Sequence, residues 1–130
     1  MRTIIVDDER LAREELKRLL ENYSEIEIIG EYKNTIEARA AIEKDAPDLV
    51  FMDIQMPGET GLELLEKMSN PPRTVFVTAY DEYAIKAFEL NAYDYLMKPI
   101  DPERLSEVYR RLAEENKTPA AVQNSDVLRQ

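Results

Sequence analysis

The feature that most constrains this 130-residue sequence is a short apolar run that ends in a carboxylate. Residues 49–52 are Leu-Val-Phe-Met, Asp53 follows them directly, and Asp48 and Pro57 bound the wider segment. An apolar run of this length between turn residues is typical of a strand that is covered on both faces, as in a parallel sheet. The segment therefore predicts a buried strand with the Asp53 carboxyl group at its carboxyl end.

Strand-like and helix-like segments alternate five times along the chain. Apolar patterns predict strands over residues 2–6, 25–32, 49–52, 73–77 and 93–97, with a helix after each. Repeated strand–helix units favour an α/β fold, with a parallel sheet and helices on both faces, because the crossovers are right-handed. The second and fifth strands alternate apolar with polar residues, so we expect them at the edges. These features predict a flavodoxin-like doubly wound fold with strand order 2-1-3-4-5.

Helical spacing also predicts which side chains of the helices are buried. The first helix carries leucines on one side, namely Leu11, Leu16, Leu19 and Leu20. The fourth helix is expected over residues 81–90 and carries Ala84, Ala87 and Phe88 at helical spacing. Asn34 is a candidate cap for the second helix, and Thr60 with Glu63 forms a candidate capping box for the third.

Composition limits the functions that are possible. The length fits one domain, which we place at residues 1–115; residues 116–130 are polar and aperiodic, so we expect a flexible tail or a linker toward an output domain outside this chain. The absence of His and Cys excludes Ser-His-Asp catalysis, His-ligated zinc and disulfides. A net charge of −10 disfavours nucleic-acid binding by this domain. Without a signal peptide or a membrane-spanning run, we expect a cytoplasmic protein with no membrane partner.

Acidic side chains follow two strands that are neighbours in this strand order. Asp7 and Asp8 come after the first strand and Asp53 after the third, so all three are expected at the sheet edge where open α/β sheets bind ligands. Three carboxylates this close repel one another, and a bound Mg²⁺, which prefers carboxylate, water and phosphate oxygens, would relieve the repulsion. The alternative is that Asp7 and Asp8 only cap the next helix and stabilise its N-terminus, where the helix dipole favours negative charge.

A hydroxyl and a cation are expected at the same edge. Thr78 ends the fourth strand and Lys98 ends the fifth. Lys98 could pair with Asp53 or with a phosphoryl oxygen, and Thr78 could donate a hydrogen bond to a phosphoryl group. The alternatives are an ordinary surface lysine and a threonine that caps the next helix. A cis peptide bond before Pro99 would form a tight turn that directs Lys98 inward.

Taken together and in this order, these residues resemble the receiver domain of bacterial two-component response regulators over about residues 1–115. The matching stretches are Ile-Ile-Val-Asp7-Asp8-Glu9, Leu-Val-Phe-Met-Asp53-Ile-Gln-Met-Pro57-Gly58, Val-Thr78-Ala79 and Tyr95-Leu-Met-Lys98-Pro99. Residues 78–88 and 92–99 further resemble the LytTR-type regulators, also called the LytR/AlgR family.

The resemblance implies a phosphoacceptor role for Asp53, which would take a phosphoryl group from the histidine of a sensor kinase. Asp8 would ligate Mg²⁺, with Asp7 acting partly through water. Asp53 itself and the backbone carbonyl of Gln55 would be further metal ligands. Such a domain assists its own phosphorylation and dephosphorylation but is not a turnover enzyme.

The resemblance also implies a conformational output. Thr78 and Lys98 would hold the phosphoryl oxygens, and Tyr95 would turn inward on phosphorylation. The surface of the fourth helix, fifth strand and fifth helix would then change, favouring a homodimer and controlling an output domain that contacts DNA. Gln55 and Tyr80 occupy positions that govern water access to the phosphoryl group, so we expect them to modulate dephosphorylation.

Three other functions are less consistent with the sequence. A haloacid-dehalogenase-like phosphohydrolase places a second Asp two residues after its Asp nucleophile, where this chain has Gln55. An interaction domain without phosphorylation would usually have lost Asp53, Thr78 or Lys98, and all three are present. A flavin-binding flavodoxin-like protein would have a hydroxyl- and Gly-rich first loop instead of Asp-Asp-Glu.

Overall fold

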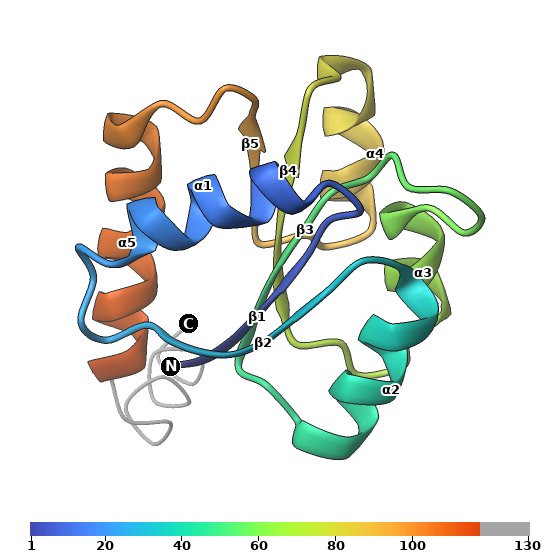
Figure 1. Ribbon diagram of the computed structural model, residues 1–130, viewed down its shortest axis with the longest axis horizontal. Helices are drawn as coiled ribbons and strands as arrows, with labels where there is room; N and C mark the ends of the chain where they lie inside the picture. Colours follow the sequence, from blue (N-terminus) through green and yellow to red (C-terminus); the bar gives the residue numbers. More distant parts are fainter. Residues whose placement is uncertain (118–130) are drawn as a thin grey trace, which may run out of the picture.

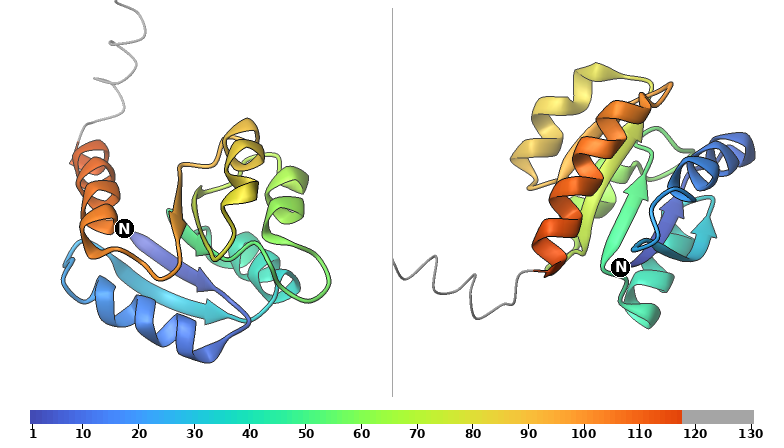
Figure 2. Two further views of the ribbon diagram at one scale, coloured as in Figure 1. Left: turned by 90° about the horizontal axis from the view of Figure 1, so that it is seen from above. Right: turned by 90° about the vertical axis from the view of Figure 1, so that its left-hand side faces the viewer.

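The computed structural model describes residues 1–117, and within them five strands form one parallel sheet. The strands are β1 (Arg2–Val6), β2 (Glu27–Tyr32), β3 (Leu49–Met52), β4 (Arg73–Thr78) and β5 (Asp94–Met97). Their order is β2-β1-β3-β4-β5, and all neighbouring pairs are parallel (Figure 2). The flavodoxin-like order predicted from the sequence is therefore confirmed.

Helices cover both faces of this sheet. They are α1 (Arg10–Leu20), α2 (Thr35–Asp45), α3 (Gly61–Lys67), α4 (Ala84–Glu89) and α5 (Pro102–Lys117). Helices α1 and α5 lie on one face, and α2, α3 and α4 lie on the other (Figure 1). The central strands are buried on both sides because successive side chains point to opposite faces. Ile4 and Val6 accordingly pack toward α2, α3 and α4, whereas Ile5 packs toward α1 and α5.

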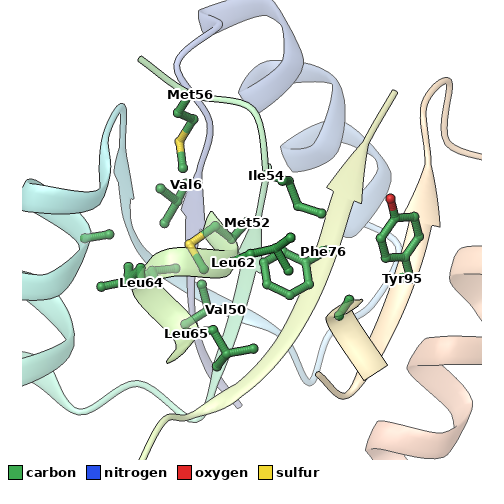
Figure 3. Packing of buried hydrophobic residues seen from close by; sticks show 13 residues of the cluster. Val6, Val50, Met52, Ile54, Met56, Leu62, Leu64, Leu65, Phe76 and Tyr95 are labelled. Atoms are coloured by element: carbon green, nitrogen blue, oxygen red, sulfur yellow. The ribbon is translucent and has the colours of Figure 1, made fainter. Parts of the chain in front are cut away.

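The core on the α2–α4 side is continuous from β1 to β5. Figure 3 shows Val50 and Met52 of β3, Phe76 of β4 and Tyr95 of β5 on this side of the sheet. All four are buried, and Leu62 of α3 is among the residues packed with them. This packing fixes the positions of the strands whose carboxyl ends carry the polar residues identified above.

Local signals in the sequence explain where two of the helices begin. Asn34 caps α2, and the predicted capping box of Thr60 and Glu63 is present at α3. The first residue of α3 is Gly61, where a Cβ atom would lie 2.5 Å from the backbone oxygen of Asp53. Only glycine allows this helix to start so close to the end of β3.

The fourth helix is shorter than predicted. Residues Asp81–Tyr83 form a 3₁₀ turn, and only Ala84–Glu89 are α-helical. Tyr80 precedes the 3₁₀ turn and Tyr83 precedes α4, and neither side chain caps the element that follows it. No strong N-terminal signal therefore fixes an α-helical start at Asp81.

Two residues expected on buried helix faces are exposed instead. Leu11 is 71 % exposed and Phe88 is 53 % exposed. Each helical residue is rotated by about 100° from the one before it, so Leu11 points about 140° away from the direction of the buried Leu16. In the short helix α4, Ala87 occupies the inward direction, which leaves its neighbour Phe88 at the side.

Within the described residues helix α5 includes Asn116 and Lys117, which the sequence analysis assigned to the tail. The rest of the predicted tail, residues 118–130, lies outside the described residues. None of the helices within residues 1–117 has the length and apolar character needed to cross a bilayer.

A buried carboxylate attaches α5 to β5. Asp94, the first residue of β5, accepts a 2.5 Å hydrogen bond from Arg104 Nη2 and a further one from Arg111 Nη2. Burial acts to raise the pKa of the Asp94 carboxyl, but the hydrogen bonds from Arg104, from the Tyr95 N–H and from Arg111 outweigh it and lower that pKa below its usual value. The ion pair therefore positions α5 against β5, the strand that leads to Lys98.

We expect Asp94→Asn to lower the free energy of unfolding by about 1–3 kcal/mol at pH 7. The loss is below that of a fully buried pair because the side chains of Arg104 and Arg111 are 38 % and 48 % exposed. Since folding lowers the pKa of Asp94, its stabilisation is present above the unfolded-state pKa of about 3.9 and is lost as the pH falls through the folded-state value. Urea denaturation should therefore show a difference that shrinks below about pH 4.

The exposed Glu107 on the same helix provides a control, Glu107→Gln, which we expect to have no measurable effect. Equal stability of the wild type and Asp94→Asn at pH 7 would contradict the role assigned to the ion pair.

Candidate functional site

The predicted site residues meet at the carboxyl edge of the sheet. Asp7 follows β1, Asp53 follows β3, Thr78 ends β4, and Lys98 follows β5. Backbone hydrogen bonds extend the sheet pairing into this edge: the Asp53 N–H donates to the Val6 carbonyl at 2.9 Å, and the Lys98 N–H donates to the Thr78 carbonyl at 2.8 Å. The four side chains are therefore held by the sheet itself rather than by long loops.

Three carboxylates are close enough to bind one cation. One oxygen each from Asp7, Asp8 and Asp53 lie within 4.8 Å of one another. Asp7 and Asp53 are only 5 % and 6 % exposed, whereas Asp8 is exposed to solvent. The Glu9 N–H donates a 2.9 Å hydrogen bond to Asp7 Oδ1, which fixes the orientation of that carboxylate. An all-oxygen, mostly buried donor set with one open side fits a hydrated Mg²⁺ ion.

Lys98 is the cation that faces this cluster. Its Nζ lies 3.0 Å from Asp53 Oδ2, one of the two partners considered from the sequence, and 2.8 Å from Asp7 Oδ2, a contact that sequence reasoning did not identify. The peptide bond between Lys98 and Pro99 is cis. Lys98 thus joins the acidic residues of β1 and β3 from the far side of β4.

The charge balance of the cluster is uneven. Burial raises the pKa of the Asp53 carboxyl above its usual value, and the hydrogen bond from Lys98 opposes this shift only in part. Burial acts to lower the pKa of Lys98, but its hydrogen bonds to Asp7 and Asp53 outweigh that effect and raise the pKa. Lys98 is therefore firmly protonated at neutral pH, while Asp53 is a carboxylate whose ionised form is costly to bury.

Thr78 supplies a donor with no partner. Its side chain is fully buried, and its hydroxyl makes no hydrogen bond to any residue of the described chain. Unsatisfied buried hydroxyls are rare because each costs about 1–3 kcal/mol. At the end of β4, next to the strand that carries Asp53, this hydroxyl fits the requirement for a donor to a bound phosphoryl oxygen.

The loops that follow β3 and β4 are in contact beside the site. The backbone N–H of Gln55 donates to Asp53 Oδ1 at 3.3 Å, and the side-chain Nε2 of Gln55 donates to the hydroxyl of Tyr83. Tyr83 was not among the predicted site residues, because no pattern in the sequence shows which tyrosine the Gln55 side chain reaches.

Tyr95 and Tyr80 form a second contact near the same loop. Tyr95 is 7 % exposed and points inward, and its hydroxyl donates to the backbone carbonyl of Tyr80. Tyr95 thus faces inward in this structure, and an inward turn on phosphorylation stays a prediction. The Tyr80 side chain is 48 % exposed and packs edge-on against the ring of Tyr83.

A cavity of about 280 Å³ lies next to Lys98 and the acidic residues. Its walls include Leu11 and Leu16 of α1, Phe51 of β3 and Ile100, and it reaches Asp53. The cavity reaches the site from the α1 side of the sheet.

We expect Asp53→Asn to raise the free energy of unfolding by on the order of 1 kcal/mol at pH 7 in EDTA. Because folding raises the pKa of Asp53, the cost of its buried charge is absent below the unfolded-state pKa of about 3.9 and is fully present above the folded-state value. The gain should therefore disappear near pH 4. With millimolar Mg²⁺, thermal denaturation should show a larger stabilisation of the wild type than of the variant.

Glu43→Gln, at an exposed position of α2, is the control for the loss of one negative charge. If Asp53→Asn were less stable than the wild type in EDTA at pH 7, the assignment of an unfavourable buried charge would be wrong.

Comparison with known proteins agrees with this geometry. The family model for the response regulator receiver domain matches residues 3–110. The transcriptional regulatory protein BtsR of Escherichia coli is 50 % identical over 117 residues, covering 88 % of this chain and 49 % of that protein. An uncharacterized response regulatory protein of Vibrio cholerae is 51 % identical over 116 residues, with 88 % and 49 % covered. The chain thus spans about half the length of the curated relatives it matches.

Solved structures lead to the same family. The response regulatory domain of protein mrkE from Klebsiella pneumoniae has a TM-score of 0.81 and 34 % identity, covering 88 % of this chain and 97 % of that one. The REC domain of AraT, a response regulator from Geobacillus stearothermophilus, has a TM-score of 0.74 and 34 % identity, with 89 % and 98 % covered. On these matches, this chain belongs to the response regulator receiver domain family.

Proposed function

We propose that this domain is a phosphorylation-activated switch in which Asp53 accepts a phosphoryl group from the phosphohistidine of a sensor kinase. The observation that carries the proposal is the arrangement around Asp53: a buried carboxylate, 3.0 Å from Lys98 Nζ and within 4.8 Å of oxygens from Asp7 and Asp8. A lysine and an oxygen-ligand set around one nucleophilic carboxylate suit phosphoryl transfer by positioning and charge neutralisation.

In the proposed reaction, a carboxylate oxygen of Asp53 attacks phosphorus, the bond from phosphorus to the kinase histidine breaks, and an aspartyl phosphate forms. Lys98 holds the reacting carboxylate and then a phosphoryl oxygen. The buried Thr78 hydroxyl, which lacks a partner among the described residues, donates to another phosphoryl oxygen. The domain is thus a phosphoacceptor that also influences its own dephosphorylation, and not a turnover enzyme.

Mg²⁺ is the proposed cofactor, and Asp7, Asp8, Asp53 and the backbone carbonyl of Gln55 are its proposed protein ligands. When bound, the ion neutralises the charge that three carboxylates and a phosphoryl group bring together. The raised pKa of Asp53 supports this assignment, because a second cation beside Lys98 would favour the ionised nucleophile.

The contact between Gln55 and Tyr83 argues against the phosphohydrolase alternative. That chemistry needs an acid two residues after the nucleophile. Here that position is Gln55, whose side-chain amide donates a hydrogen bond to the Tyr83 hydroxyl. An amide cannot protonate a leaving group at neutral pH.

We further propose that phosphorylation strengthens a homodimer through the face formed by α4, β5 and α5. Large exposed apolar side chains on this face support the proposal: Ile85 and Phe88 of α4 and Met97 of β5 are 76 %, 53 % and 40 % exposed. Exposed apolar clusters are typical of protein contacts.

The wider role that we infer is control of transcription in the cytoplasm by a LytTR-type regulator. The segments 78–88 and 92–99 support the subfamily, and the relative named as a transcriptional regulatory protein supports the role. In this proposal, an output domain outside this chain contacts the DNA, consistent with the net charge of −10 of these 130 residues.

The phosphoacceptor proposal is tested by intact-mass spectrometry after incubation with acetyl phosphate. We expect one added phosphoryl group that requires Mg²⁺ and is absent from Asp53→Asn. Lys98→Met should keep the fold but lower the rate of labelling by about 10²-fold or more, because the reacting oxygens lose their charged partner. Labelling of Asp53→Asn at the wild-type rate would contradict the assignment, as would a wild type that neither a kinase nor acetyl phosphate can phosphorylate.

The dimer is tested by sedimentation velocity in the micromolar range, with and without phosphorylation. We expect phosphorylation to increase the dimer fraction and Ile85→Asp to abolish that increase, because a charge on the apolar face would be buried in the dimer without a partner. Ile36→Asp is the matched control, since Ile36 is 80 % exposed on α2, outside this face. An unchanged sedimentation coefficient on phosphorylation, or equal effects of the two variants, would rule out this face.

A further inference from the structure

One hydrogen bond links the two loops that leave the strands of the phosphoacceptor site. Gln55 lies two residues after Asp53, and Tyr83 lies five residues after Thr78. The side-chain amide of Gln55 donates to the Tyr83 hydroxyl, so the bond spans the space between the loop after β3 and the segment that begins α4. Those two loops flank the space between Asp53 and Thr78, where a phosphoryl group on Asp53 would lie.

Hydrogen bonds from both its backbone and its side chain orient Gln55. Its backbone N–H donates to Asp53 Oδ1 at 3.3 Å, which places the residue directly beside the reacting carboxylate. Its side chain is otherwise exposed, and the Tyr83 hydroxyl is the one hydrogen-bond partner that the structure gives the side-chain amide within residues 1–117. Without that partner, the flexible side chain would sample many rotamers in water.

The tyrosine end of the bond is held more firmly than the glutamine end. The Tyr83 ring is half-buried and packs against the core on the α2–α4 side. It also contacts the Tyr80 ring edge-on at a centroid distance of 6.3 Å, and Tyr95 anchors the backbone of Tyr80 from β5. Tyr83 can therefore hold Gln55, because its own position is set by the core and by the neighbouring loop.

We propose that Tyr83 is a positioning residue for the lifetime of the aspartyl phosphate: through its hydroxyl it holds the Gln55 side chain away from the phosphoryl group. This inference rests on the proposed phosphoacceptor role of Asp53. A free glutamine amide next to the phosphoryl group can accept a hydrogen bond from a water molecule and orient it toward phosphorus. When its Nε2 is bonded to Tyr83, the amide is held toward that loop and its free oxygen cannot turn to orient a water molecule beside phosphorus, so the phosphoryl group is hydrolysed more slowly.

The test is the decay of the phosphorylated protein after removal of the phosphodonor, with Mg²⁺ present, followed by intact mass. Tyr83→Phe removes the hydroxyl and keeps the ring, and we expect about a two- to tenfold faster decay, the rate equivalent of one neutral hydrogen bond. Tyr23→Phe is the matched control, because Tyr23 pairs with Tyr109 in the opposite core and should leave the decay unchanged.

A double-mutant cycle separates positioning from a general loosening of the loop. In a Gln55→Ala background the backbone carbonyl remains but the amide is gone, so Tyr83→Phe should no longer change the decay rate. If Tyr83→Phe decays like the wild type, or accelerates decay equally in both backgrounds, the inference is wrong while the phosphoacceptor role stands. If the wild type takes no phosphoryl group at Asp53, both are wrong.

Discussion

The electrostatic conflict at the carboxyl edge of the sheet is the constraint on which the site depends. Asp7 and Asp53 are buried beside each other, Asp8 adds a third carboxylate, and Lys98 contacts two of them at 2.8 and 3.0 Å. Burial of Asp53 raises the pKa of its carboxyl above the usual value, and the hydrogen bond from Lys98 offsets this shift only in part. A second cation and a phosphoryl group are the additions that this arrangement can accommodate.

The scaffold keeps these charges together by continuing the sheet into the site. Backbone hydrogen bonds from Asp53 to Val6 and from Lys98 to Thr78 hold the residues next to the strand ends in register. Gly61 allows α3 to begin against the Asp53 carbonyl, and the buried Asp94 fixes α5 to β5. The charged cluster lowers the stability of the fold. The two apolar cores, which bury both faces of the central strands, offset this loss.

The two loops next to the site connect the residues around Asp53 to the surface of α4. Gln55 links the Asp53 carboxylate to Tyr83, and Tyr95 links β5 to the backbone of Tyr80. Both contacts converge on the segment that begins α4, whose outer side carries exposed apolar residues. These hydrogen bonds and ring contacts are the route by which the proposed phosphorylation of Asp53 would affect that surface.

The sequence alone determined the strand order and placed the three carboxylates and Lys98 at one edge, because period-two and helical apolar patterns place strand ends at one edge of a parallel sheet. It did not determine which residues of a helix face inward when the helix is short, as Phe88 illustrates. Nor did it specify the contacts of Lys98 with Asp7 or of Gln55 with Tyr83. Side-chain contacts between loops far apart in the chain depend on packing distances that no local pattern encodes, so only the tertiary structure decided them.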